Sequence, residues 1–128
     1  MLVFAGLSAC DRELFGDKAG ETCGAVLSAA AMTGVQLVNV HALGGRAMLE
    51  AAVQAISAGV PMGADRPRLL AVTLLTSMDH RAMKEVGIGG EPKVRVVKLA
   101  QLAKKSGVDG VVASVQAEYL TKGLWRRR

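Results

Sequence analysis

The sequence has little cysteine, few aromatic residues and no long apolar run. Its two cysteines, Cys10 and Cys23, are too few for a disulfide scaffold and too far apart for a zinc motif. A reduced, cytoplasmic protein is therefore the default expectation. No apolar run approaches the roughly 20 residues that span a bilayer, and Met1–Ala9 lacks the basic start of a signal peptide. We expect neither a membrane protein nor a metal-binding one.

Nucleic-acid binding is also not expected. Aromatic residues make up 3% of the chain, so base stacking has few platforms. The formal net charge is +5, but three of the positive charges stand together at Arg126–Arg128, and no dense basic stripe occurs elsewhere. A basic chain of this kind remains compatible with small phosphorylated ligands.

The abundant residue types of the chain indicate an α/β domain. The chain has 128 residues, of which 51% are hydrophobic and 15 are glycine. This length is enough for one domain with a core. Small aliphatic residues suit helices packed closely on a parallel sheet.

Three segments carry the main pattern: an apolar, β-branched run that turns polar at its carboxyl end. His41, Thr76 and Ser114 mark these ends at nearly even intervals, and helical sequence fills each interval. In parallel α/β folds the functional residues lie beyond the carboxyl ends of the strands. The predicted strands are Val35–His41, Arg68–Leu75 and Val108–Ser114.

Helical periodicity and punctuation predict the connecting helices. Gly34, Gly59 and Gly107 stand where helix ends are expected, and Pro92 suits a first helical position. Residues 1–21 and 123–128 do not follow this pattern. The predicted helices are Gly24–Thr33, Arg46–Ala58, a short one around His80–Val86, Pro92 to about Lys105, and one over Gln116–Lys122.

The strand ends supply candidate site residues, each with a structural alternative. His41 could act as an acid, a base or a ligand contact, or it could be a buried histidine bonded to a neighbouring strand. Gly44–Gly45 could present backbone N–H groups to an anion, or form a tight turn. Thr76 and Ser77 could bond the polar edge of a ligand, or serve as helix N-caps or turn residues.

At these strand ends the sequence resembles orotidine 5′-phosphate decarboxylase of the bacterial type, over roughly Thr22 to Leu120. The matching segments read V-N-V-H-A-x-G-G from Val38, A-V-T-x-L-T-S-M-D from Ala71 and D-G-V-V-x-S-x-Q from Asp109. The resemblance implies part of a TIM (β/α)8 barrel with about three to four βα units. It further implies a homodimer that converts orotidine monophosphate to uridine monophosphate and CO2 without metal or organic cofactor.

The resemblance also implies roles for individual residues. In the family, a motif Asp-x-Lys-x-x-Asp-x-x-Asn-Thr supplies a lysine that protonates the pyrimidine carbon, and carboxylates that position it. Here Thr22 matches the final Thr, and Asp17 and Lys18 are the candidates for the first Asp and the Lys. Thr22, Thr76, Ser77 and His41 are then expected to contact substrate.

This motif departs from the family pattern, because Asp17 and Lys18 are adjacent instead of two positions apart. As residues of a loop, they could equally be a solvated charge pair. We expect the chain, taken as one incomplete barrel domain over residues 1–128, to be a truncated or rearranged family member. The alternative is a non-catalytic module that binds a phosphorylated ligand, or serves assembly, on a half-barrel scaffold.

Overall fold

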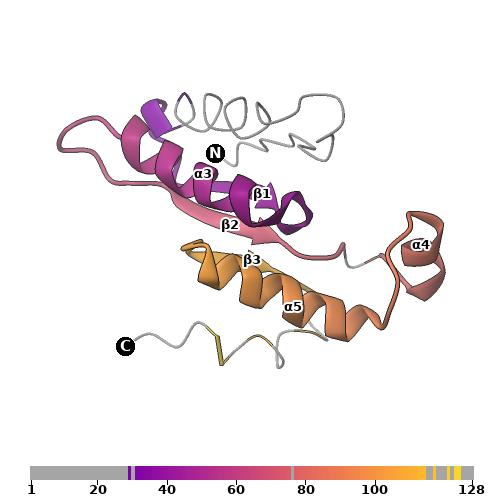
Figure 1. The fold of residues 1–128 in the computed structure, drawn as a ribbon. Helices are drawn as coiled ribbons and strands as arrows, with labels where there is room; N and C mark the ends of the chain where they lie inside the picture. Colours follow the sequence, from indigo (N-terminus) through magenta and orange to yellow (C-terminus); the bar gives the residue numbers. More distant parts are fainter. Residues whose placement is uncertain are drawn as a thin grey trace.

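A parallel sheet of three strands organises the chain in the computed structural model, which describes residues 29, 31–75, 77–114, 117, 121 and 123–124. The strands are β1 (Leu37–His41), β2 (Arg68–Val72) and β3 (Gly110–Val112), in the order β1-β2-β3. Both pairings are parallel, and the strands point toward the same end of the molecule (Figure 1). The predicted α/β class and parallel sheet are confirmed.

Two long helices connect the strands and lie together on one face of the sheet (Figure 1). They are α3 (Gly45–Gly59), preceded by the short 3-10 turn η2 (Ala42–Gly44), and α5 (Pro92–Lys105). The short helix α4 (His80–Glu85) stands beyond the carboxyl end of β2. No helix among the described residues is long and apolar enough to cross a membrane.

Most of the predicted helix boundaries are confirmed. Pro92 opens α5, and Gly107, with φ +85°, follows it in the left-handed conformation that glycine adopts without strain. The predicted end at Gly59 is also confirmed, since Gly59 is the last residue of α3 and the extended residue Val60 follows it. Of the first and last predicted helices, residues 29, 31, 32, 117 and 121 are described as helical, Thr33 is in a turn, and the remaining residues lie outside the described residues.

The two faces of the sheet differ in what they carry. Val38, Val40, Leu69, Ala71 and Val111 point toward α3 and α5 and belong to the main apolar core. Because side chains alternate along a strand, the intervening residues occupy the other face, here called the inner face. The strand register arranges the inner face in rows: Leu37 beside Arg68, Asn39 beside Leu70 and Gly110, and His41 beside Val72 and Val112.

Gly110 of β3 lies beside Leu70 of β2 in the middle row of the inner face. A Cβ atom at Gly110 would lie 3.0 Å from Cδ2 of Leu70, closer than side chains normally pack. A side chain at Gly110 would therefore require the end of the Leu70 side chain to shift by a few tenths of an ångström.

The described apolar residues form two clusters. The main cluster joins the sheet to α3 and α5 through Leu49, Ile56 and Ala103. A second cluster lies beyond the carboxyl ends of β2 and β3, where Leu74, Met83 of α4 and Val96 of α5 are buried together with Ala117. This second cluster anchors α4 to the rest of the fold.

A network of hydrogen bonds, here called the amino-end clamp, joins the amino ends of β2 and β3. The carboxylate Oδ2 of Asp109 accepts hydrogen bonds from the backbone N–H of Leu69 at 2.7 Å and from Nη1 of Arg66 at 2.8 Å. The Arg66 Nε also donates to Oγ of Ser57 at the end of α3, at 3.3 Å. Asp109 therefore ties the start of β3 to the start of β2, and through Arg66 to α3.

Candidate functional site

A hollow of about 580 Å³ lies beyond the carboxyl ends of β2 and β3, and is here called the carboxyl-end pocket. Its floor comes from the second apolar cluster, including Leu74 and Val96. Its polar lining comes from three places: the segment after β2, the segment after β3 and the start of α5. The polar and charged lining residues are Ser77, Asp79, His80, Glu91, Lys93 and Ser114.

The segment after β2 is shaped by a turn followed by a capped helix. The N–H of Met78 donates to the carbonyl of Leu75 at 2.9 Å, which closes the turn that contains Ser77. The carboxylate of Asp79 then accepts a hydrogen bond from the N–H of Ala82 at 2.8 Å and caps α4. Of the two structural alternatives for Ser77, the structure shows the turn residue and not the N-cap, and Ser77 stands exposed on the pocket wall.

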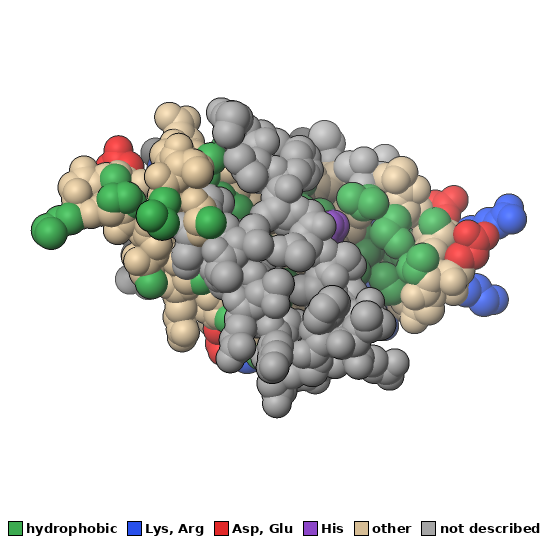
Figure 2. Space-filling model, turned by 90° about the horizontal axis from the view of Figure 1, so that it is seen from above, with side chains coloured by type: hydrophobic (Ala, Val, Ile, Leu, Met, Phe, Trp, Pro, Cys, Tyr) green, Lys and Arg blue, Asp and Glu red, His purple; other side chains and the backbone are tan. Residues whose placement is uncertain are grey.

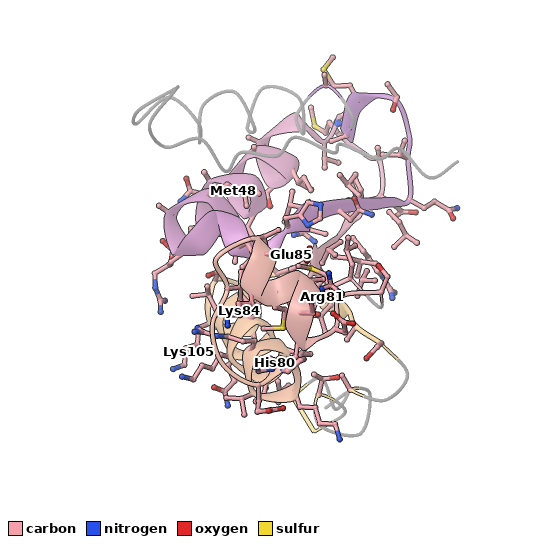
Figure 3. The ribbon with its side chains drawn as sticks, turned by 90° about the vertical axis from the view of Figure 1, so that its right-hand side faces the viewer. Met48, His80, Arg81, Lys84, Glu85 and Lys105 are labelled. Carbon is pink, nitrogen blue, oxygen red and sulfur yellow. The ribbon has the colours of Figure 1, made fainter. Side chains whose placement is uncertain are left out.

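Three polar side chains of the pocket have hydrogen-bonding groups that a ligand could use. Those of Ser77, His80 and Lys93 are exposed and make no hydrogen bond or ion pair with another described residue. Figure 3 looks onto this end of the molecule, with α4 in front and His80 on the side of α4 next to α5. A hydroxyl, an imidazole and an ammonium around an apolar floor suit a ligand that has both a ring and anionic or hydroxyl groups.

The space-filling view adds the surroundings of the pocket. Hydrophobic side chains gather at the end of the molecule that carries α4, next to acidic and basic side chains (Figure 2). Leu75 and Val86, which stand before and after α4 in the sequence, are exposed hydrophobic residues. Among the described residues, no group of three or more His, Cys, Asp or Glu side chains could hold a metal ion.

His41 lies at the carboxyl end of β1, outside the lining of the carboxyl-end pocket. It is the last residue of β1, half-buried on the inner face, in the row with Val72 and Val112. Its imidazole makes no hydrogen bond to another described residue, so the described structure contains no bond to a neighbouring strand. His41 is not among the residues that line the carboxyl-end pocket, which means that the structure does not bring it together with Ser77.

Gly44 and Gly45 form a tight connection between β1 and α3. Gly45 has φ +83°, and its N–H donates to the carbonyl of Ala42. One of the two backbone donors proposed for an anion is therefore already used inside the turn. The geometry favours the turn interpretation for Gly45.

Four of the predicted site residues lie outside the described residues: Asp17, Lys18, Thr22 and Thr76. Thr76 is flanked by Leu75 and Ser77, which both line the pocket. Sequence reasoning missed Glu91 and Lys93. Their signal was the position of Pro92 at the start of a helix, because a helix that returns along a parallel sheet begins at the carboxyl end of the strands.

A second hollow, of about 790 Å³, lies at the opposite end, between the segment before β1 and the loop before β2. Arg66, one of its charged lining residues, is engaged in the amino-end clamp. Ligand sites of parallel α/β proteins lie at the carboxyl ends of the strands. The smaller hollow is therefore the better candidate site.

Parallel strands, helices packed on one face and a pocket beyond the carboxyl ends are the features of a βα-barrel protein. The comparisons with known proteins agree. The sequence profile of the orotidine 5′-phosphate decarboxylase / HUMPS family matches residues 15–125, and the chain belongs to this family.

The chain matches less than half of the length of individual curated relatives. An orotidine 5′-phosphate decarboxylase of Alcanivorax borkumensis is 51% identical over 108 residues, which cover 84% of this chain and 45% of the relative. The enzyme of Vibrio atlanticus is 46% identical over 102 residues, covering 80% and 43%. The chain thus spans less than half the length of these curated relatives.

Solved structures give the same result for the fold. The orotidine 5′-phosphate decarboxylase of Lactobacillus acidophilus superposes with a TM-score of 0.78 at 35% identity, over 84% of this chain and 49% of the other. An uncharacterised conserved protein of Geobacillus kaustophilus superposes with a TM-score of 0.77 at 43% identity, over 83% and 50%. The described fold corresponds to part of a TIM barrel, as the resemblance implied.

Proposed function

We propose that this chain, acting as one domain, takes part in the decarboxylation of orotidine monophosphate to uridine monophosphate. The observation that carries the proposal is the carboxyl-end pocket, which combines an apolar floor with polar side chains that have no partner among the described residues. In a member of the orotidine 5′-phosphate decarboxylase / HUMPS family, this is the pocket that a nucleotide would fill.

The substrate contacts are assigned by chemistry. Thr76 and Ser77 offer hydroxyls for the polar edge of the pyrimidine, since Ser77 lines the pocket and Thr76 precedes it. Lys93 offers an ammonium for an anionic group at the same wall. Thr22 and His41 are the remaining contacts that the family resemblance implies, although His41, at the carboxyl end of β1, lies outside the lining of the pocket.

The reaction step needs a proton donor and no electron acceptor. When the bond between the pyrimidine ring and its carboxylate breaks, CO2 leaves and the electron pair stays on the ring carbon. The ammonium of Lys18 would then donate a proton to that carbon, and Asp17 would keep Lys18 charged and in place. Fixed charges of this kind stabilise the transition state because they need no reorganisation.

The proposal includes a homodimer in the cytoplasm. Exposed apolar side chains at the carboxyl end of the sheet, among them Leu43 and Leu75, support a partner surface there. Sedimentation of the purified protein would test the dimer, and a monomer at all concentrations would contradict it.

Lys18→Ala tests the chemistry. Turnover of orotidine monophosphate is followed by absorbance, and the variant is expected to lose activity by roughly a hundredfold or more. Lys105→Ala is the matched control, because Lys105 is exposed at the far end of α5 (Figure 3) and should leave the rate unchanged. Equal rates for Lys18→Ala and the unchanged protein would remove Lys18 from the mechanism.

Calorimetry with uridine monophosphate separates the alternatives. Binding together with turnover supports the decarboxylase. Binding without turnover indicates a non-catalytic module for a phosphorylated ligand, and no binding contradicts both. Competition by sugar phosphates would point to a different phosphorylated substrate.

A further inference from the structure

Thr73 is a buried polar residue that the proposed function does not use. It directly follows β2, and 1% of its surface is exposed. Its neighbours Ala71 and Val72 are buried as well. A hydroxyl at such a position must form a hydrogen bond, since an unsatisfied one would destabilise the fold.

The hydroxyl of Thr73 forms a bond that crosses to the next strand. Thr73 Oγ1 donates to the carbonyl oxygen of Val112, the last residue of β3, at 2.9 Å. The backbone N–H of Thr73 donates to the same oxygen at 3.1 Å. These two bonds are here called the carboxyl-end clamp. The buried Ser106 differs, because its hydroxyl donates within its own helix, to the carbonyl of Leu102.

The clamp stands at the base of both segments that enclose the pocket. Leu74, Leu75 and Ser77 follow Thr73 directly, and all three line the pocket. On the other side, Val112 leads to Ala113 in the second apolar cluster and to Ser114 in the pocket wall. The backbone bond alone would continue the strand pairing, so the hydroxyl adds a second constraint where the strands separate.

We propose that Thr73 is a positioning residue, which holds the two walls of the carboxyl-end pocket at the separation needed to bind a nucleotide. It touches no substrate and acts through Val112 and the two segments that follow. This inference rests on the proposed function for the identity of the ligand. The positioning itself depends only on the geometry of the clamp.

The test compares variants that differ in the hydroxyl. Thr73→Val keeps the shape and removes the donor, Thr73→Ala is a second hydroxyl-free variant, and Thr73→Ser keeps the donor. Asp109→Asn weakens the amino-end clamp and serves as the matched control at the other end of the same strand pair. Amide hydrogen exchange and the dissociation constant for uridine monophosphate are measured on the full chain.

For Thr73→Val we expect exchange about fivefold faster in residues 74–78 and 113–114, the factor corresponding to one intramolecular hydrogen bond. The dissociation constant should rise by about the same factor, because the pocket must be ordered before it binds. Thr73→Ser should stay within about twofold of the unchanged protein. Asp109→Asn should speed exchange near residue 69 and leave the dissociation constant unchanged.

Faster exchange confined to the two pocket walls, with rescue by Thr73→Ser, supports the inference. Exchange that is unchanged, or that rises evenly along the chain, overturns it. If the unchanged protein fails to bind uridine monophosphate, the proposed function fails, while the exchange comparison still decides whether Thr73 positions the two walls. Should Thr73→Val not fold, Thr73→Ala is judged by the same criteria.

Discussion

The two ends of the β2–β3 pair are fastened by different chemistry. At the amino end, a carboxylate accepts two hydrogen bonds in a partly exposed position, with side-chain exposures of 33% for Arg66 and 30% for Asp109. At the carboxyl end, the neutral hydroxyl of Thr73 donates a hydrogen bond to the carbonyl of Val112 in a buried position. If the chain binds a nucleotide as proposed, the amino end serves stability and the carboxyl end serves binding.

The apolar clusters repeat this division. The main cluster unites the sheet with α3 and α5. Among the described residues, the second cluster joins α4, α5, Ala117 and the segments that follow β2 and β3. A change in the second cluster should therefore affect the pocket before it affects the whole fold.

Met83→Ala should give the largest effect. Met83 is 1% exposed at the centre of the second cluster, and its truncation should lower the free energy of unfolding by about 3 kcal/mol, since it leaves a cavity. Denaturation in urea measures this loss. Met62 is fully exposed, so Met62→Ala is the matched control and should change stability by less than about 0.5 kcal/mol. Equal losses would show that α4 is not anchored by this cluster.

Asp109→Ala should lower the free energy of unfolding by about 2 kcal/mol, because the buried N–H of Leu69 loses its charged acceptor. Arg66→Ala removes the partly exposed ion pair and the exposed hydrogen bond to Ser57, and should cost less than about 1 kcal/mol. Both values come from urea denaturation of the two variants side by side. A larger loss for Arg66→Ala would mean that the ion pair, and not the bond to Leu69, holds the amino end.

Asp79→Ala should cost about 1 kcal/mol, through loss of the cap on α4. Asp79→Ser should retain most of the stability, because a serine hydroxyl also accepts from the helix start. Hydrogen exchange of α4 would show whether the loss is local. If both variants exchange like the unchanged protein, the cap does not stabilise α4.

Arg81→Ala should give the smallest effect, a few tenths of a kcal/mol at most. The pair between Arg81 Nε and Glu85 Oε1, at 3.2 Å, is highly exposed on α4 (Figure 3). Thermal unfolding in low and high salt checks this expectation. A loss comparable to that of Asp79→Ala would contradict it.

Much of the fold could be predicted from local pattern. The β-branched runs that end at His41 and Val112 pair as expected. The strands are shorter than predicted, because each one is paired only as far as its neighbouring strand extends. Proline at the start of α5 and glycine after its end mark that helix in the sequence.

The site was less predictable. Thr76, Ser77 and Asp79 all have side chains that can cap a helix, and only the position of the first turn of α4 decides that Asp79 does so. Glu91 and Lys93 reach the pocket because α5 begins at the carboxyl end of the sheet; Pro92 marks the start of the helix in the sequence, but only the packing of α5 on the sheet brings that start to the pocket.

The sequence by itself determined the strand and helix periods, the family and the residue types at the strand ends, because these depend on neighbours along the chain. Only the tertiary structure decided how the ends are fastened. Asp109 meets Leu69 from 40 residues away, and Thr73 meets Val112 from 39. Such partners are set by the register of parallel strands, which forms only when the sheet and its helices pack together.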